Sequence, residues 1–433
     1  MATVLCRVVH LTPRFITGIR KMTKLQVHAV SGTDISPISR GHSFCALRKS
    51  FCELSQAPMR TFSTDMEYRD RPHADLVTPL LSDAGSRAIK ELIVNPGSLL
   101  KVSLPQCAAE VEVVIGQIDR IVAEVMMAGE EEDLGVHLET TATTNTLEVK
   151  QTGEKHSSAF KVKAWIPERF CSVEVETGGG SVYVAGVTEG ALRVVSHGGN
   201  AAFGKIRSAT ATVITGGGTV KADVLSAMLD LDSGGGACRV KRIVGGQLHI
   251  TTGELDVDVL YGDHVNIACK SARIEQMQIG VQAKVRAYDP IGLGICVGGL
   301  DGSAGFETTG GDVELQLQER TKYVEVASNG GGVVLRVPEA MSGGIHLSAQ
   351  AAGGIQILPP LVLEGSTDGA TSASGALGGI SEEGSGHRLL VAEREADDRK
   401  TCSVVISASS GSLKISQRSW FESKFGKMAF SQK

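Results

Sequence analysis

A short pattern that recurs every 17 to 19 residues constrains this chain most. From Cys171 onward, a stretch of alternating apolar and polar residues is followed by glycines and then by a second alternating stretch. The glycines stand at 178–180, 198–199, 216–218 and 234–236. Alternation is typical of a strand with one buried face. A fixed period indicates stacked units, because no single unit of this kind can bury its own apolar face.

The apolar positions of successive units align in five columns, which we expect to face the interior. The two columns before the glycines are Val173, Leu192, Ala211, Leu229, Leu248 and Val265, and Val175, Val194, Val213, Leu231, Ile250 and Ile267. The three columns after them are Val182, Ala201, Val220, Cys238, Leu255 and Ala272, then Val184, Phe203, Ala222, Val240, Val257 and Ile274, then Val187, Ile206, Leu225, Ile243, Leu260 and Met277. Strands stack at a spacing of ~4.8 Å, so we expect the glycines at corners that leave no room for a Cβ atom. These features predict an all-β, single-stranded β-solenoid, similar to a right-handed β-helix, with coils of 18 or 19 residues and glycine-rich corners; the pattern does not determine the handedness.

Changes in composition divide the chain into six segments. We expect an organelle-targeting presequence at 1–62, a linker at 63–86, a strand-rich lead-in at 87–170, the main solenoid at 171–360, a disordered Gly/Ser/acidic insertion at 361–400, and the last coil with a C-terminal cap at 401–433. The expected cap contains Trp420, Phe421 and Phe425 at near-helical spacing. A binding tail is the alternative interpretation of these residues.

The first 62 residues differ in charge from the rest. They contain nine Lys/Arg and two acids, which is +7, so the remainder carries −12 of the total of −5. Val4, Leu11 and Ile19 fall on one stripe of a basic helix, a pattern typical of mitochondrial presequences. Arg60 precedes a candidate cleavage site after Phe62. We therefore expect a mitochondrial protein, with a plastid transit peptide or an untargeted basic tail as the alternatives.

The same counts exclude several classes of partner and site. An acidic body disfavours nucleic acid, because Lys/Arg contacts to phosphate dominate that affinity. No apolar run reaches the ~18 residues of a membrane-spanning helix. The nine cysteines contain no C-x-x-C pair, so we interpret them as small buried residues rather than as zinc or disulfide sites.

No catalytic motif is present in the sequence. One group of four aspartates resembles the carboxylate pairs of sugar-cleaving enzymes and is considered first. Asp230, Asp232, Asp256 and Asp258 point outward on nearby units, and paired carboxylates cleave sugars in many glycosidases. However, the first two precede a glycine corner and the last two follow one, so we expect them on different sides. The acidic run 130–133 lacks the alternating spacing of a calcium loop. We therefore predict no catalytic, cofactor-binding or metal-binding residue.

The run FKVKAWIPERFCSVEVETGGGSVYVAGVTEGALRVVSHGGN (160–200) resembles the adhesin-like domain family of unknown function, in its eukaryotic, mitochondrial-type branch. The resemblance covers roughly residues 90–415. It implies a β-solenoid fold and no established catalytic residue. The function that we expect is a non-catalytic binding or scaffold protein of an organelle, with a protein partner. A carbohydrate-active β-helix enzyme and a purely structural protein are the alternatives.

Overall fold

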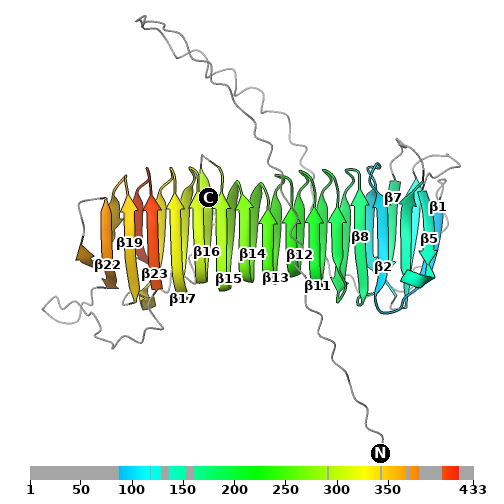
Figure 1. Cartoon of the computed structure of the whole chain (residues 1–433), viewed down its shortest axis with the longest axis horizontal. Helices are drawn as coiled ribbons and strands as arrows, with labels where there is room; N and C mark the ends of the chain where they lie inside the picture. The colour runs from blue at the N-terminus through cyan, green and yellow to red at the C-terminus, as the bar shows by residue number, and fades with distance from the viewer. Residues whose placement is uncertain are drawn as a thin grey trace, which may run out of the picture. The chain divides into compact units, whose positions relative to one another are not determined.

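The computed structural model describes residues 87–117, 119–127, 136–152, 160–289, 292–341, 344–366, 371–379 and 402–418. They all belong to one compact unit, 81–433. The expected presequence, linker, acidic run 130–133 and C-terminal cap lie outside the described residues. The described residues form 24 strands and two short 3₁₀ helices, so the all-β prediction is confirmed. These strands make up one long mixed sheet, in which they lie side by side (Figure 1).

The central strands pair in parallel with strands of the adjacent repeat units. They are β8 (Cys171–Thr177), β9 (Val182–Thr188), β10 (Leu192–Val195), β11 (Ala201–Ile214), β12 (Val220–Asp232), β13 (Cys238–Thr251), β14 (Glu254–Cys269), β15 (Ser271–Ala287), β16 (Leu293–Thr308) and β17 (Asp312–Ser328). Val213 pairs with Leu231, and Leu231 pairs with Ile250. All five predicted columns match the pairing register, and every member is buried.

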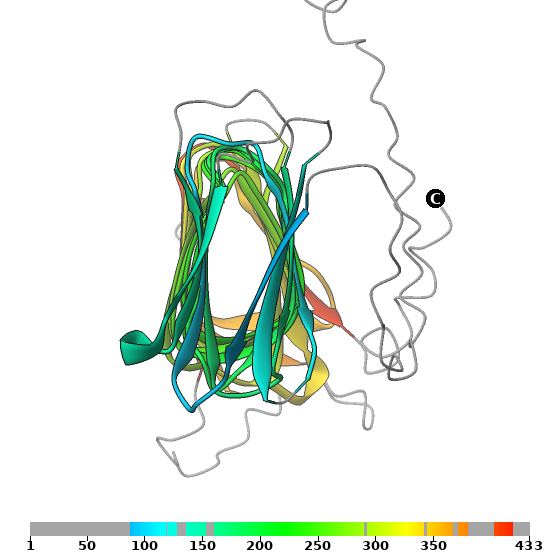
Figure 2. The ribbon, with the colours of Figure 1, turned by 90° about the vertical axis from the view of Figure 1, so that its right-hand side faces the viewer.

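The long strands bend, so that their two halves belong to two opposite walls (Figure 2). Wall A contains β8, β10 and the second halves of β11–β17, and wall B contains β9 and their first halves. Shifts of register between Arg207 and Thr210, and between Ser226 and Leu229, mark the bend. The sequence predicted a separate strand on each side of every glycine corner. In β11–β17 the strand after one corner continues through the bend into the strand before the next corner. The buried columns fill the space between the walls.

The glycine corners have the predicted close packing. A Cβ atom on Gly199 would overlap the carbonyl oxygen of Gly180, and one on Gly218 would overlap that of Gly199. A column of buried hydroxyls just before the glycines was not predicted. Its members donate to the carbonyl three residues later: Thr177 to Gly180 (3.1 Å), Ser196 to Gly199 (2.6 Å), Thr215 to Gly218 (2.8 Å) and Ser233 to Gly236 (2.7 Å). Each buried hydroxyl is therefore satisfied at its own corner.

The N-terminal strands do not follow chain order in space. They are β1 (Arg87–Ile93), β2 (Ser98–Leu104), β3 (Glu110–Ile115), β4 (Arg120–Met127), β5 (Val136–Thr141), the 3₁₀ helix η1 (Ala142–Thr144), β6 (Thr146–Gln151) and β7 (Phe160–Ile166). β2 lies between β6 and β8, and β3 lies between β7 and β9. The pairs β1–β4, β4–β7 and β5–β6 are antiparallel.

The C-terminal strands show the same kind of intercalation. They are β18 (Val333–Pro338), the 3₁₀ helix η2 (Glu339–Met341), β19 (Ile345–Ala351), β20 (Ile355–Ile357), β21 (Leu361–Ser366), β22 (Ser372–Gly379), β23 (Cys402–Ala408) and β24 (Leu413–Arg418). β23 lies between β17 and β19 (Figure 1), and β24 lies between β18 and β20. The prediction that 401–418 forms the last coil is therefore wrong, because strands pair by complementary edges rather than by chain order.

The expected disorder of 361–400 is also wrong for its first part. β21 and β22 pair antiparallel with each other, and β22 pairs with β19. Leu361, Ala373 and Leu377 are buried. These few apolar residues are enough to hold the pair on the sheet, although glycine and serine surround them. Residues 380–400 lie outside the described part of the chain.

Candidate functional site

A shallow groove of about 590 Å³ crosses wall A over strands β11 to β15. Two rows of outward side chains line it. The first row is Thr212, Asp230, His249, Asn266 and Lys284, and the second row is Thr210, Met228, Gln247, His264 and Gln282. In the first row each residue pairs in register with the next. The rows therefore run across the strands, with a step of ~4.8 Å from one side chain to the next.

The inner face of the same strands positions these side chains. Ala211, Leu229, Leu248 and Val265 alternate with the groove residues and are buried. Successive side chains of a strand point to opposite faces, so the buried residue between the rows directs both of its neighbours outward. The groove is thus a consequence of the core register.

Most of the groove side chains are neutral and can hydrogen bond. The Asn266 Nδ2 atom lies 3.3 Å from His249 Nδ1, which lets the amide donate to the ring nitrogen. Asp230 and Lys284 are the charged groups of the first row, and they lie on strands β12 and β15. Met228 is 52% exposed. The surface therefore offers both donors and acceptors with no net charge when the histidines are neutral.

The four aspartates that the sequence singled out do not converge. Asp230 lies in the groove beside His249, and Asp232 accepts a hydrogen bond from the backbone N–H of Gly234 (2.8 Å). Asp256 lies in wall B, where Arg239 and Arg273 occupy the same register position on the two neighbouring strands. Asp258 is also on wall B. The expected separation of the two pairs is confirmed.

In the part of the chain that the structure describes, no group of three or more His, Cys, Asp or Glu side chains is placed to hold a metal ion. Cys107, Cys171, Cys238, Cys269 and Cys402 are buried, as expected for small core residues, and Cys296 is half-buried. Burial raises the pKa of the Cys171, Cys238, Cys269 and Cys402 thiols to about 12. These thiols are poor nucleophiles at neutral pH.

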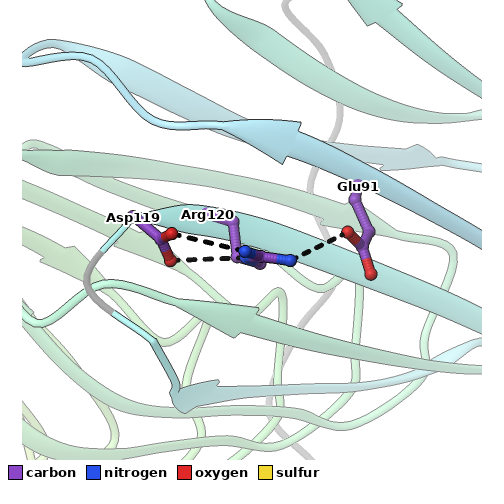
Figure 3. A network of polar contacts seen from close by, with 3 residues as sticks. All are labelled: Glu91, Asp119 and Arg120. Atoms are coloured by element: carbon purple, nitrogen blue, oxygen red, sulfur yellow. Dashed lines mark hydrogen bonds and ion pairs between the residues drawn. The ribbon is translucent and has the colours of Figure 1, made fainter.

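A second polar cluster lies on the outer face of β1 and β4 (Figure 3). The Arg120 Nε atom is 3.3 Å from Asp119 Oδ1, and its Nη1 atom is 3.4 Å from Glu91 Oε2. The hydrogen bonds from Arg120 lower the pKa of the Asp119 carboxyl. All three side chains are exposed to solvent. Such surface ion pairs contribute little to stability, so we do not interpret this one as a site.

Comparisons with known proteins give no family assignment. No family model matches the chain, and no curated protein matches it. One similar solved structure is a candidate cell adhesion protein from Clostridium sporogenes, with 13% sequence identity over 77% of this chain and 100% of that chain and a TM-score of 0.17. A candidate adhesin from Parabacteroides merdae has 11% identity over 57% of this chain and 95% of that chain, with a TM-score of 0.27. A candidate lipid-binding protein from Parabacteroides distasonis has 14% identity over 57% of this chain and 96% of that chain, with a TM-score of 0.29. At these scores the similarities carry no argument about function.

Sequence reasoning found only one member of the groove for its chemistry, Asp230. The sequence did contain the information needed to find the first row, because the outward residues recur at the same intervals as the inward columns. In the first row, the residues on β11 to β14 each stand one position before a member of the second predicted column. Lys284 on β15 stands one position before the buried Val285, which continues that column. What the sequence did not show is that this stretch of wall A is hollow.

Among the described residues, no helix has the length and apolar character needed to cross a membrane.

Proposed function

We propose that this chain is a non-catalytic, adhesin-like binding protein whose binding surface is the groove of wall A. The observation that carries the proposal is the double row of outward, hydrogen-bonding side chains on five adjacent strands. An extended partner laid across the strands would contact many of these groups at once.

A rigid support favours binding by such a surface. The residues under the groove, among them Leu231, Ile250 and Ile267, are fully buried. The hydroxyl column closes one corner in each of four units with hydrogen bonds of 2.6–3.1 Å. The backbone under the groove therefore does not need to be ordered on binding, which lowers the entropic cost of association.

The separation of the aspartates disfavours the enzyme alternative. Glycoside hydrolysis needs two carboxyl groups at most about 9.5 Å apart on either side of one bond. Asp230 lies on wall A and Asp256 on wall B, and the buried columns lie between the walls. In a purely structural protein the hollow in wall A would have no role.

We further propose that the paired strands form a single β-solenoid, and that the protein acts in a mitochondrion, with a plastid as the alternative. The recurrent register of β11–β15 supports the first proposal. The basic, amphipathic residues 1–62 support the second.

Proximity labelling in cells tests the binding surface. Asn266→Trp fills the groove from an exposed position, and Gln276→Trp places the same side chain on wall B as a matched control. We expect the set of labelled neighbours to shrink for Asn266→Trp alone. If both variants label the same neighbours as the unmodified chain, the groove is not the binding surface.

A further inference from the structure

We propose that the groove holds a neutral, hydroxyl-rich linear chain, an oligosaccharide, laid across strands β11 to β15. This inference rests on the proposed function and names the chemical class of the ligand. Three properties of the lining residues lead to it, namely their charge, their polarity and their spacing.

The charge of the groove disfavours an anionic polymer. Its lining residues include one acid, Asp230, and one base, Lys284. Polyanions such as nucleic acids depend on several Lys/Arg contacts to their charged groups. Lys284 also lies 3.8 Å from Glu307, which offsets its charge. The ligand that matches this surface is therefore uncharged.

The near absence of large outward apolar side chains disfavours a lipid or a protein partner, although carbon atoms make up most of the accessible surface of the groove. Among the lining residues, Met228 is the one large apolar side chain that points outward, because Leu229, Leu248 and Val265 are buried. A lipid chain needs large apolar side chains around it, and protein interfaces depend on apolar or aromatic anchors in pockets. The protein partner that the sequence suggested would find no such pocket here.

The polar groups match a sugar in kind. The amides of Gln247, Asn266 and Gln282, and the rings of His249 and His264, can each donate and accept hydrogen bonds. Sugar hydroxyls also do both.

The spacing repeats on the scale of one sugar unit. The rows place one side chain every ~4.8 Å on five strands, a step closer to the length of one sugar ring than to that of one amino-acid residue. A peptide advances by only ~3.3–3.6 Å per residue, so its residues would fall out of step with the strands. The lining contains no Phe, Tyr or Trp ring on which a sugar could stack. Affinity must therefore come from many hydrogen bonds, and it should increase with chain length.

Calorimetric titration of the full chain with neutral linear glycans tests the proposal. The probes are cellohexaose, maltohexaose and chitohexaose, with their disaccharides and with the acidic hexagalacturonate for comparison. We expect at least one neutral hexasaccharide to bind more tightly than its disaccharide and than hexagalacturonate. Gln247→Ala or His264→Ala should each weaken this binding about three- to tenfold, the value of one or two hydrogen bonds. Gln276→Ala on wall B should leave it unchanged.

The possible failures are distinguishable. If no neutral hexasaccharide binds, if hexagalacturonate binds best, or if Gln247→Ala and Gln276→Ala behave alike, the glycan proposal is wrong. The proposed function still stands in those cases if Asn266→Trp removes labelled neighbours in cells. If those neighbours are proteins bound without a glycan, the ligand class is wrong and the binding surface is correct.

Discussion

Neighbouring residues of one strand can have opposite environments in this protein. Leu231 is fully buried between Val213 and Ile250, and Asp230 beside it is exposed in the groove. The side-chain period of a strand is two, so a register error of one residue would exchange their roles. Substitutions at this scale therefore report the register directly.

Leu231→Asp should destabilise the protein strongly, and Asp230→Leu should not. The first change places an unpaired carboxylate in the core, which costs several kcal/mol. The second alters an exposed side chain and should change the free energy of unfolding by about 0.5 kcal/mol or less. Denaturant unfolding of both variants measures the difference. A larger loss for Asp230→Leu would contradict the assigned register.

Gly218→Ala tests the close packing of the corners. The added Cβ would overlap the carbonyl oxygen of Gly199, and overpacking of this kind costs about 1–3 kcal/mol. Gly246→Ala is a matched control, because its nearest neighbour would be Asp263 Oδ2 at an ordinary 3.7 Å. Thermal melts should show a lowered midpoint for Gly218→Ala and little change for Gly246→Ala. Equal effects would mean that the corners have room for a side chain.

The buried thiols should resist alkylation in the folded protein. At pH 8, a thiol with a pKa of about 12 has roughly one thiolate in 10⁴ molecules, and only the thiolate reacts. Iodoacetamide should therefore modify the half-buried Cys296 before Cys171, Cys238, Cys269 and Cys402. Mass spectrometry of peptides after a timed reaction measures the order. Modification of Cys238 at the rate of Cys296 would show that the core opens readily.

At each end of the sheet, two strands are inserted between strands from another part of the chain. β23 pairs in parallel with β17 on one side and with β19 on the other, and β24 is held in the same way by β18 and β20. β2 and β3 occupy the equivalent place at the other end. Each inserted strand is thus hydrogen bonded along both edges, which protects edges that would otherwise promote aggregation.

Cleavage of the chain between β22 and β23 should leave the C-terminal fragment attached. A protease site engineered within 381–400 separates the two parts covalently, but Val404, Ile406, Leu413 and Ile415 remain buried in the sheet. Both fragments should elute together in size-exclusion chromatography.

Two substitutions in β23 provide the control for this cleavage. Val404→Asp should release the cleaved fragment, because its side chain is fully buried, and Val405→Asp should retain it, because its side chain is only half-buried. Loss of the fragment without any substitution would contradict the pairing of β23 with both of its neighbours.

One core runs through the whole described sheet. The columns continue beyond the predicted units, since Val265 pairs with Ala283, Ala283 with Ala304, and Ala304 with Val324. Val324 pairs in turn with Val404 of the inserted β23. At the other end, Val173 pairs with Leu100. The core is therefore continuous from the N-terminal strands to the inserted C-terminal strands.

Deletion of residues 1–62 should abolish organelle import and leave the fold intact. The basic, amphipathic start of the chain motivates this expectation, since a targeting presequence is removed from the mature protein. Microscopy of tagged chains measures import, and circular dichroism of the purified variant measures the fold. Import of the shortened chain, or an intact Met1 in protein isolated from the organelle, would contradict the proposed address.

The groove shows how far a sequence pattern reaches towards a site. The alternation around Leu231 and Ile250 was enough to assign which residues point outward, including Asp230 and His249. It could not show which outward residues gather around a hollow. That depends on the sizes and positions of side chains on five strands together, which a pattern within one unit does not contain.

Local periodicity by itself determined the strands, their buried faces and the glycine corners, because each of these depends on a few residues in one or two adjacent units. Only the tertiary structure decided the order of the strands at the two ends. The placement of β2 between β6 and β8, and of β23 between β17 and β19, depends on which free edges meet. Backbone hydrogen bonds between parallel strands are nearly independent of side-chain identity, so the sequence of an inserted strand carries little record of the position that it takes.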